Sequence, residues 1–352
     1  MEPLSSSKWH LRFGVTPNCN FECEYCNPDG YEMKPTLPET EVEEILEAAK
    51  INGIDRVHWT GGEPTFRNDF PKLMKSAKEL GFTKQIITTN GYRLHNIIDE
   101  CIENGLTRVI VSLDTLKSDR FLELTHKNMF YNVLKGLEDS VKKLESSTKI
   151  SAVTMKSTLP ELKDFVKYAQ DINSKEYKGN LIIKLNQFFP SNPAQLKKRG
   201  QDYWTQEFTS EQEILETLAQ IGSLTPLERT NIEGDNPTYN YYIIGDTGVQ
   251  VGVLSLFSQG YPCGGCHKLR IQPNGNVSVC LNLYDQPSLV GKSVNEKAKI
   301  MADVINYREN SINKDMPNRR HYRGQLGELR FGKLGEPKDM EYFYNILQGK
   351  RK

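Results

Sequence analysis

The sequence carries no net charge, because its 45 lysines and arginines are balanced by 45 aspartates and glutamates. A broad basic surface for nucleic acid is therefore not expected. The sequence also lacks an apolar run near the ~20 residues that a membrane helix needs. Its start, MEPLSSSKWH, has no apolar core of the signal-peptide kind. We therefore expect a cytoplasmic protein that binds neither a membrane nor nucleic acid.

Cysteine is scarce, and the seven cysteines that are present are unevenly spaced. Disulfides are not their expected use, because the cytoplasm keeps thiols reduced. Six of them form two triplets: Cys19, Cys23 and Cys26, and Cys263, Cys266 and Cys280. Two groups so far apart in the chain predict two separate metal or cofactor sites.

The first half of the chain alternates between strand and helix patterns. The predicted strands are 9–15, 55–60, 84–89, 107–113, 149–155 and 180–189, and the predicted helices are 39–53, 69–81, 94–105, 129–145 and 159–172. About six such units imply a parallel sheet with right-handed crossovers, either open and doubly wound or closed into a full or partial barrel. In either case ligands lie at the carboxyl ends of the strands.

The alternation weakens after about residue 190, where one helix is predicted at 210–221. From residue 241 the pattern changes to short strands, YYIIG, VQVGVLS, KLRIQP and NVSVCLNL, with PNGN as a hairpin turn. We therefore predict a barrel-type unit at residues 1–240, a small β-rich module at 241–330 that carries the second triplet, and a tail at 331–352.

The first triplet lies in VTPNCNFECEYCNPDG, directly after the first predicted strand. Thiolates in a C-x3-C-x2-C spacing can each bind one iron of a cubane [4Fe–4S] cluster and leave the fourth iron open to a small molecule. A structural zinc ion would need a fourth protein ligand, and no His or Cys follows Cys26 closely. The pattern therefore favours an iron–sulfur cluster over zinc or unliganded thiols.

These motifs resemble those of the radical SAM superfamily. Tyr25 is the aromatic residue before the last cysteine of the triplet, and GGEP (61–64) follows a predicted strand as the superfamily's second motif does. The resemblance implies that S-adenosylmethionine (SAM) chelates the open iron and is cleaved to a 5′-deoxyadenosyl radical, which abstracts a hydrogen from the substrate. It also implies SAM contacts by Tyr25, Gly62 and Ser112.

The composition of GGEP agrees with a cofactor site. Gly61 and Gly62 lack a Cβ, so their backbone can approach a ligand closely. The Glu63 carboxylate can accept a hydrogen bond from an ammonium group. We therefore expect these three residues to belong to the cofactor site.

The second triplet, in CGGCHKLRIQPNGNVSVC, has the spacing C-x2-C-x13-C, and the predicted hairpin brings its cysteines together. One interpretation is a zinc ribbon with His267 or an outside residue as fourth ligand, although His267 directly follows Cys266 and is awkwardly placed for the same ion. The other is a second [4Fe–4S] cluster with an open iron that can bind substrate. A cluster used only for electron relay would usually have all its irons ligated.

The whole arrangement resembles the GTP 3′,8-cyclase family, which acts in molybdenum cofactor biosynthesis. Segments from about residue 9 to 325 match in order, among them LRFGVTPNCNFECEYCNP, WTGGEPTFRNDF and CGGCHKLRIQPNGNVSVCLN. The resemblance implies an α/β fold, a partial (β/α)6 TIM-like barrel that holds SAM, with a small C-terminal β-rich auxiliary-cluster domain. The substrate-binding positions that it implies are Arg12, Arg56, His58, Thr89, Lys149, Lys184, Lys268 and Arg270.

Several of these positions depart from the family pattern. His58 stands where the family has a nucleotide-binding arginine, and a neutral imidazole is a poor ligand for phosphate. The family's Arg-x-Arg pair is Lys268-Leu269-Arg270, and the sequence ends in QGKRK rather than Gly-Gly. The cluster ligands are kept while the substrate contacts differ. The expected substrate is therefore GTP or, alternatively, another nucleotide, a sugar, a secondary-metabolite precursor or a peptide.

We therefore expect an enzyme rather than a non-enzymatic iron–sulfur or zinc module. Its expected cofactors are two [4Fe–4S] clusters and SAM. Its expected partners are a small-molecule substrate and an electron donor such as flavodoxin or ferredoxin.

Overall fold

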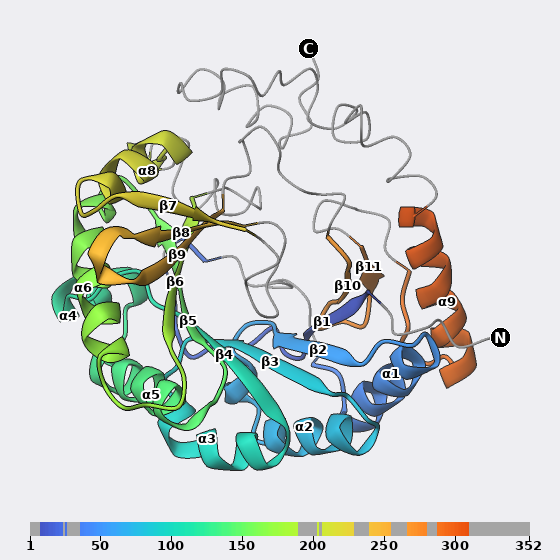
Figure 1. Ribbon diagram of the computed structural model, residues 1–352. Helices are drawn as coiled ribbons and strands as arrows, with labels where there is room; N and C mark the ends of the chain where they lie inside the picture. Colours follow the sequence, from blue (N-terminus) through green and yellow to red (C-terminus); the bar gives the residue numbers. More distant parts are fainter. Residues whose placement is uncertain are drawn as a thin grey trace.

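The computed structural model describes residues 8–23, 25–26, 36–188, 203, 206–228, 239–254, 266–279 and 287–309. In these ranges a curved sheet of eleven strands surrounds the centre of the molecule, and helices cover its outer side (Figure 1). The predicted α/β fold built on a parallel barrel-type sheet is confirmed.

Six parallel strands, adjacent in chain order, form the middle of the sheet. They are β1 (His10–Gly14), β2 (Arg56–Thr60), β3 (Lys84–Thr89), β4 (Leu106–Ser112), β5 (Thr148–Thr154) and β6 (Leu181–Gln187). The helices that return the chain between them are α1 (Glu39–Ile51), α2 (Phe70–Glu79), α3 (Leu94–Glu103), α4 (Ser118–Thr125), α5 (Phe130–Lys143) and α6 (Leu162–Asn173). Because the six strands are parallel, their carboxyl ends lie at one rim of the sheet. The loops expected to carry the chemistry begin at this rim.

The core lies between the sheet and these helices. On β1, Leu11 and Phe13 are fully buried, and the Phe13 ring stacks on Trp59 of β2 at 5.9 Å between ring centroids. Successive side chains of a strand point to opposite faces. The polar residues that alternate with Leu11 and Phe13, namely His10 and Arg12, therefore point toward the centre of the barrel.

Strands from the last third of the chain extend this sheet at both edges. β10 (Lys268–Ile271) pairs in parallel with β1 and antiparallel with β11 (Val277–Ser278). At the other edge, β9 (Val249–Leu254) pairs in parallel with β6, and β8 (Asn240–Ile244) and β7 (Leu224–Leu227) follow it. The division at residue 240 stays a prediction, and strands from both sides of it share one sheet.

Two elements were not expected from the sequence. Helix α4 and strand β7 are short, and β7 contains Pro226. Proline is compatible with β7 because this strand forms the edge of the sheet, where its missing N–H costs no ladder bond. Helix α8 (Glu211–Ala219), in contrast, lies where one was predicted and begins with a capping box of Ser210 and Glu213.

Helix α9 (Val294–Tyr307) packs beside α1 (Figure 1). The buried Lys297 ammonium forms an ion pair with Glu41 Oε1 at 2.8 Å and also contacts Glu44, both on α1. The Asn52 side chain, just after α1, donates to Ala298 O at 2.9 Å. Among the described helices, none combines the length and apolar character needed to cross a membrane.

Candidate active site

The first cysteine triplet follows β1 at the rim formed by the carboxyl ends of the strands. Cys19 and Cys23 are partly buried, and Cys26 is exposed. We call residues 15–37, which follow β1 and include the three cysteines, the cysteine segment. The loop after β2 bonds to the start of this segment through its backbone: Gly62 N donates to Thr16 O at 2.7 Å, and Glu63 N donates to Asn18 O at 2.8 Å. The GGEP loop is therefore a support for the cysteine segment.

Both glycines of this loop are required by its contact with the cysteine segment. A Cβ on Gly62 would lie 2.1 Å from Asn18 O, and a Cβ on Gly61 would lie 2.4 Å from Thr16 O. Gly61 also has φ +132°, which side chains rarely adopt. The predicted close approach to a ligand stays a prediction, whereas the close approach of the two protein segments is observed.

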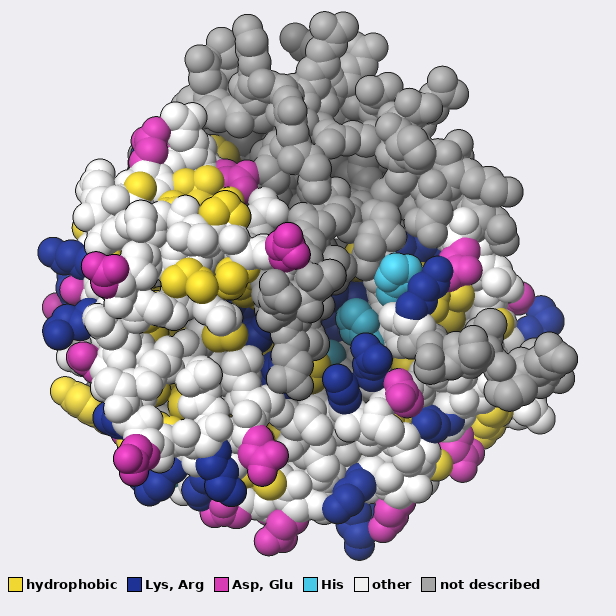
Figure 2. Space-filling model, viewed as in Figure 1, with side chains coloured by type: hydrophobic (Ala, Val, Ile, Leu, Met, Phe, Trp, Pro, Cys, Tyr) yellow, Lys and Arg dark blue, Asp and Glu magenta, His cyan; other side chains and the backbone are white. Residues whose placement is uncertain are grey.

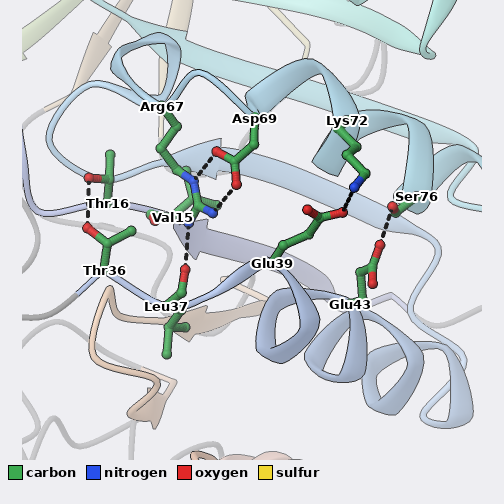
Figure 3. A network of polar contacts seen from close by, with 10 residues as sticks. All are labelled: Val15, Thr16, Thr36, Leu37, Glu39, Glu43, Arg67, Asp69, Lys72 and Ser76. Carbon is green, nitrogen blue, oxygen red and sulfur yellow. Dashed lines mark hydrogen bonds and ion pairs between the residues drawn. The ribbon is translucent and has the colours of Figure 1, made fainter.

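Arg67 joins the two ends of the cysteine segment (Figure 3). Its Nη1 donates to Val15 O and to Leu37 O, both at 2.9 Å, and its Nε donates to Asp69 Oδ1 at 2.8 Å. Thr16 Oγ1 and Thr36 Oγ1 lie 3.4 Å apart beside this contact. A planar guanidinium can bind two carbonyls and a carboxylate at once, so Arg67 closes the base of the loop.

Glu63 links the ends of β2 and β3. Its side chain is 1% exposed. Oε1 accepts hydrogen bonds from Thr65 N at 2.9 Å, Thr65 Oγ1 at 2.6 Å and Thr89 Oγ1 at 2.7 Å, and Oε2 accepts one from Asn90 N at 2.6 Å. Burial raises the pKa of the carboxyl group, and these four donors oppose the rise. The predicted bond from Glu63 to an ammonium group stays a prediction.

Asp114, after β4, supports the cysteine segment from another side. Its carboxylate accepts a hydrogen bond from the Tyr25 hydroxyl and another from Val153 N at 2.6 Å. Burial raises the pKa of Asp114 to about 7. Helix α4 begins only at Ser118, so Asp114 joins the cysteine segment to β4 and β5 rather than capping this helix.

The three thiols of the first triplet fit an iron–sulfur cluster. All three cysteines lie in one loop after β1, and burial, followed by Cys26, Asp114 and Cys19, raises the pKa of the Cys23 thiol. Within the described ranges, no three His, Cys, Asp or Glu side chains are arranged to hold one metal ion. A cubane does not need that arrangement, because each thiolate binds a different iron.

The centre of the barrel is lined by cations. Lysines and arginines occur in the described strands at Arg12, Arg56, Lys84, Arg108, Lys149, Lys184, Lys268 and Arg270, and no Asp or Glu occurs in those strands. The pairing register places five residues in one row across five neighbouring strands: Arg270, Arg12, His58, Ile86 and Arg108. In Figure 2, Lys or Arg and His side chains gather around the hollow at the centre of this face.

We call the side of the sheet that carries this row, with Lys149 and Lys184, the inner face. Two histidines on this face have lowered pKa values, and neighbouring cations contribute to both. Burial lowers the pKa of His58 well below the ordinary value of 6.5, and Arg12, Lys268, His10 and Lys184 lower it further. Burial and the neighbouring Lys268, Arg270, Arg12 and Arg56 lower the pKa of His10 to about 3. The His58 imidazole is therefore neutral. Its Nε2 lies 2.6 Å from Thr88 Oγ1.

Aromatic rings pack on the lysines of the inner face. Lys149 Nζ lies 5.6 Å from the centre of the Tyr241 ring, and Lys184 Nζ lies 3.9 Å from that of Tyr239. Gly252 makes room for this layer, because a Cβ there would lie 2.6 Å from Tyr241 Cε1. Such cation–π contacts stabilise a buried ammonium group without neutralising it.

Cys266, the one described cysteine of the second triplet, lies at the other end of the strands. Cys266 precedes β10, which runs parallel to β1 with Lys268 opposite His10. Cys19 follows β1, so Cys266 and Cys19 lie at opposite ends of these two strands, with the inner face between them. Cys263 and Cys280 fall outside the described residues.

Known proteins match this chain in sequence and in fold. The model for the radical SAM superfamily matches residues 14–169. A GTP 3′,8-cyclase of Helicobacter pylori (strain HPAG1) is 29% identical over 317 residues, which are 88% of this chain and 91% of the relative. One from Psychromonas ingrahamii is 30% identical over 303 residues, 84% of each chain. The chain belongs to the radical SAM superfamily, in the family of the GTP 3′,8-cyclases.

This radical SAM enzyme also has solved neighbours of the same fold. Streptococcus suis SuiB, in a crystal structure bound to S-adenosylmethionine, superposes with a TM-score of 0.54 at 17% identity, over 89% of this chain and 68% of SuiB. At that identity the likeness shows the fold alone. The family itself implies SAM and a [4Fe–4S] cluster as cofactors.

The structure brings most of the predicted site residues of this radical SAM enzyme to two places. Tyr25, Gly61, Gly62, Glu63, Thr89 and Ser112 lie at the rim with the first triplet, and Arg12, His58, Lys149, Lys184, Lys268 and Arg270 lie on strands that form the inner face. Arg56 is exposed at the start of β2 and lies 3.7 Å from Asp55. The roles assigned to these residues stay predictions.

Two residues of the site were missed in the sequence. Arg108 is one charge within the apolar run TRVIVSL, and only its register with Ile86 reveals that it shares the row of Arg12 and His58. Asn90 follows Thr89 in TTNGY, a segment after a predicted strand that was expected to carry the chemistry, but Asn90 itself was not singled out. Its amide proves to contact Cys19.

Proposed function

We propose that this chain is a two-cluster radical SAM enzyme that acts on an anionic nucleotide, with the cyclisation of GTP as the leading reaction. Cys19, Cys23 and Cys26 hold the SAM-binding cluster, and Cys263, Cys266 and Cys280 hold an auxiliary cluster. A partner such as flavodoxin or ferredoxin supplies the electron.

The single observation that carries the proposal is the cationic inner face between Cys19 and Cys266. Lys149 and Arg108, which are 1% and 6% exposed, lie on this face with Arg12, Lys184, Lys268 and Arg270. Charge-assisted bonds from arginine and lysine to phosphate are among the strongest hydrogen bonds available. A face with several such side chains therefore suits a polyphosphate.

When bound, the cluster held by Cys19, Cys23 and Cys26 and the SAM beside it would supply the radical chemistry that removes a hydrogen atom from the substrate. The chain's own residues orient the reactants. Glu63, Arg67 and Asp114 fix the cysteine segment at the rim, while the inner face holds the anionic end of the substrate.

GTP is favoured because the matching relatives are named GTP 3′,8-cyclases. One observation favours a different nucleotide as the second candidate. His58 stands where the family resemblance predicts an arginine, and its lowered pKa keeps it neutral. This position of the inner face therefore offers no positive charge to a phosphate, which suits a substrate with less negative charge.

The test is an anaerobic turnover assay with the reconstituted full chain, SAM and a low-potential reductant. We expect about eight irons per chain, release of 5′-deoxyadenosine, and a new product from GTP that mass spectrometry identifies as the cyclised nucleotide. Parallel reactions contain GDP, GMP and other nucleotides. Turnover of one of these in place of GTP would support the second candidate, and zinc with no SAM cleavage would overturn both.

A further inference from the structure

We propose that Asn90 is a positioning residue that raises the reduction potential of the cluster at the first triplet, by donating an N–H···S hydrogen bond to Cys19. Asn90 Nδ2 lies 3.8 Å from Cys19 Sγ, within reach of a bond to sulfur. The inference rests on the proposed cluster at this triplet and goes beyond the roles of the thiolates themselves.

The Asn90 side chain is held in one orientation by its other bonds. Its Nδ2 also donates to Asn20 Oδ1 at 2.8 Å, and its Oδ1 accepts a hydrogen bond from Tyr92 N at 3.1 Å. The bond from Tyr92 identifies which end of the amide is oxygen, so the NH2 group points to the sulfur. A donor fixed in this way requires no reorganisation when the charge on the sulfur changes.

The backbone of Asn90 is fixed as well. Asn90 N donates to Glu63 Oε2 at 2.6 Å, and the neighbouring Thr89 hydroxyl donates to the other oxygen of the same carboxylate at 2.7 Å. Glu63 therefore holds the Asn90 loop and, through its own backbone bond to Asn18 O, the cysteine segment. One buried carboxylate thus sets the distance between the amide donor and Cys19.

The Asn90 hydrogen bond should raise the reduction potential because it stabilises negative charge on the Cys19 sulfur. Reduction adds an electron to the cluster and its thiolates, and a hydrogen bond to a ligating sulfur stabilises that added negative charge. Cys19 Sγ also accepts a hydrogen bond from Phe21 N at 3.3 Å. The Asn90 amide adds the side-chain donor, which a substitution can remove without changing the backbone.

The experiment is a redox titration of the reconstituted full chain, followed by the electron paramagnetic resonance (EPR) signal that changes when SAM is added. That response separates this cluster from an auxiliary one. Asn90→Ala should lower the midpoint potential, with the reduced-to-oxidised ratio at a fixed potential falling about tenfold, which is about 59 mV for a one-electron couple. Asn90→Asp retains an acceptor for Tyr92 N and replaces the donor by a negative oxygen, so its potential should fall further.

Asn20→Ala is the matched control. It removes the other acceptor of the Asn90 amide but leaves the donor to Cys19, so the midpoint potential should not fall. An equal fall in Asn20→Ala would mean that loosening of the loop is responsible, and it would overturn the proposal.

A second measurement detects the hydrogen bond directly. In the unaltered enzyme with 15N-labelled asparagine side chains, pulsed EPR should detect a weak 15N coupling to the reduced cluster, and Asn90→Asp should abolish it. Absence of that coupling, or unchanged potentials in both Asn90 variants, would overturn the role of Asn90. Such results would contradict the role of Asn90 but not the proposed function. Conversely, if the enzyme turned over no nucleotide, the proposed function would fail while the measured potentials would still test the role of Asn90.

Discussion

The Tyr25 hydroxyl donates a hydrogen bond to the buried carboxylate of Asp114, and this bond connects the cysteine segment to the end of β4. Asp114 also accepts a bond from Val153 N of β5, which lies beyond the last β4–β5 pair, Ser112 and Ser151. One side chain thereby continues the sheet and supports the loop that follows β1.

The bond between Tyr25 and Asp114 should be measurable by a double-mutant cycle. Tyr25→Phe and Asp114→Asn should each lower the free energy of unfolding at pH 8, and the double variant should lose less than their sum. We expect a coupling of about 1.5–3 kcal/mol, as for buried hydrogen bonds to charged groups. Purely additive losses would show that the two groups do not interact in solution.

Arg67 should be essential for closing the base of the cysteine segment. Arg67→Met leaves Val15 O and Leu37 O without their donor and should cost about 2–4 kcal/mol of unfolding free energy. Arg67→Lys should recover only part of this, because one ammonium cannot reproduce the fork. Arg120→Met, which breaks an exposed ion pair with Glu123, is the control and should cost about 0–1 kcal/mol.

Gly62→Ala should separate the GGEP loop from the cysteine segment. The added Cβ would lie 2.1 Å from Asn18 O, so one of the two backbones must move. We expect most of the iron bound at the first triplet to be lost, as measured by iron content and the SAM-dependent EPR signal. Gly248→Ala is the control, since its Cβ would have no neighbour within 4 Å. That variant should cost about 1 kcal/mol of backbone strain and retain its iron.

The cations of the inner face should favour substrate binding. Lys149→Met and Arg108→Met should each weaken nucleoside triphosphate binding by at least about tenfold. Titration calorimetry measures the dissociation constants, with Lys142→Met, at an exposed position on α5, as the control. Unchanged binding in both inner-face variants would contradict a role for these two cations in holding the phosphates.

The lowered pKa of His58 determines how stability should depend on pH. The imidazole ionises with its ordinary pKa of 6.5 when the chain is unfolded, whereas in the folded protein Arg12, Lys268, His10 and Lys184 help to keep it neutral. Below pH 6.5 the unfolded state therefore binds a proton that the folded state does not, and the free energy of unfolding falls as the pH falls.

Thermal unfolding between pH 8 and pH 5.5 measures this effect. His58→Gln should remove about 1 kcal/mol of the loss seen in the unaltered protein. The glutamine amide can still contact Thr88 Oγ1, so packing is largely kept. An identical pH dependence in the two proteins would mean that folding does not change the pKa of His58.

The sequence determined the elements that follow from local patterns. Strands β1 to β6 and their helices have regular alternation between apolar periods of two and of 3.6 residues, and these periods depend only on neighbouring residues. The first cysteine triplet was evident for the same reason, since its ligands lie within one loop. Helix α4 and strand β7 were missed because short polar or proline-containing segments carry little periodic signal.

The tertiary structure decided which distant segments meet. No local pattern relates Lys268 to His10, yet the pairing of β10 with β1 puts Cys266 and Cys19 at opposite ends of one wall. Likewise, the register of β3 with β4 places Arg108 in line with Arg12 and His58, and the Glu63 carboxylate fixes Asn90 against Cys19. Such contacts depend on hydrogen bonds between strands and loops far apart in the chain, and these form only when the strands have assembled into one sheet.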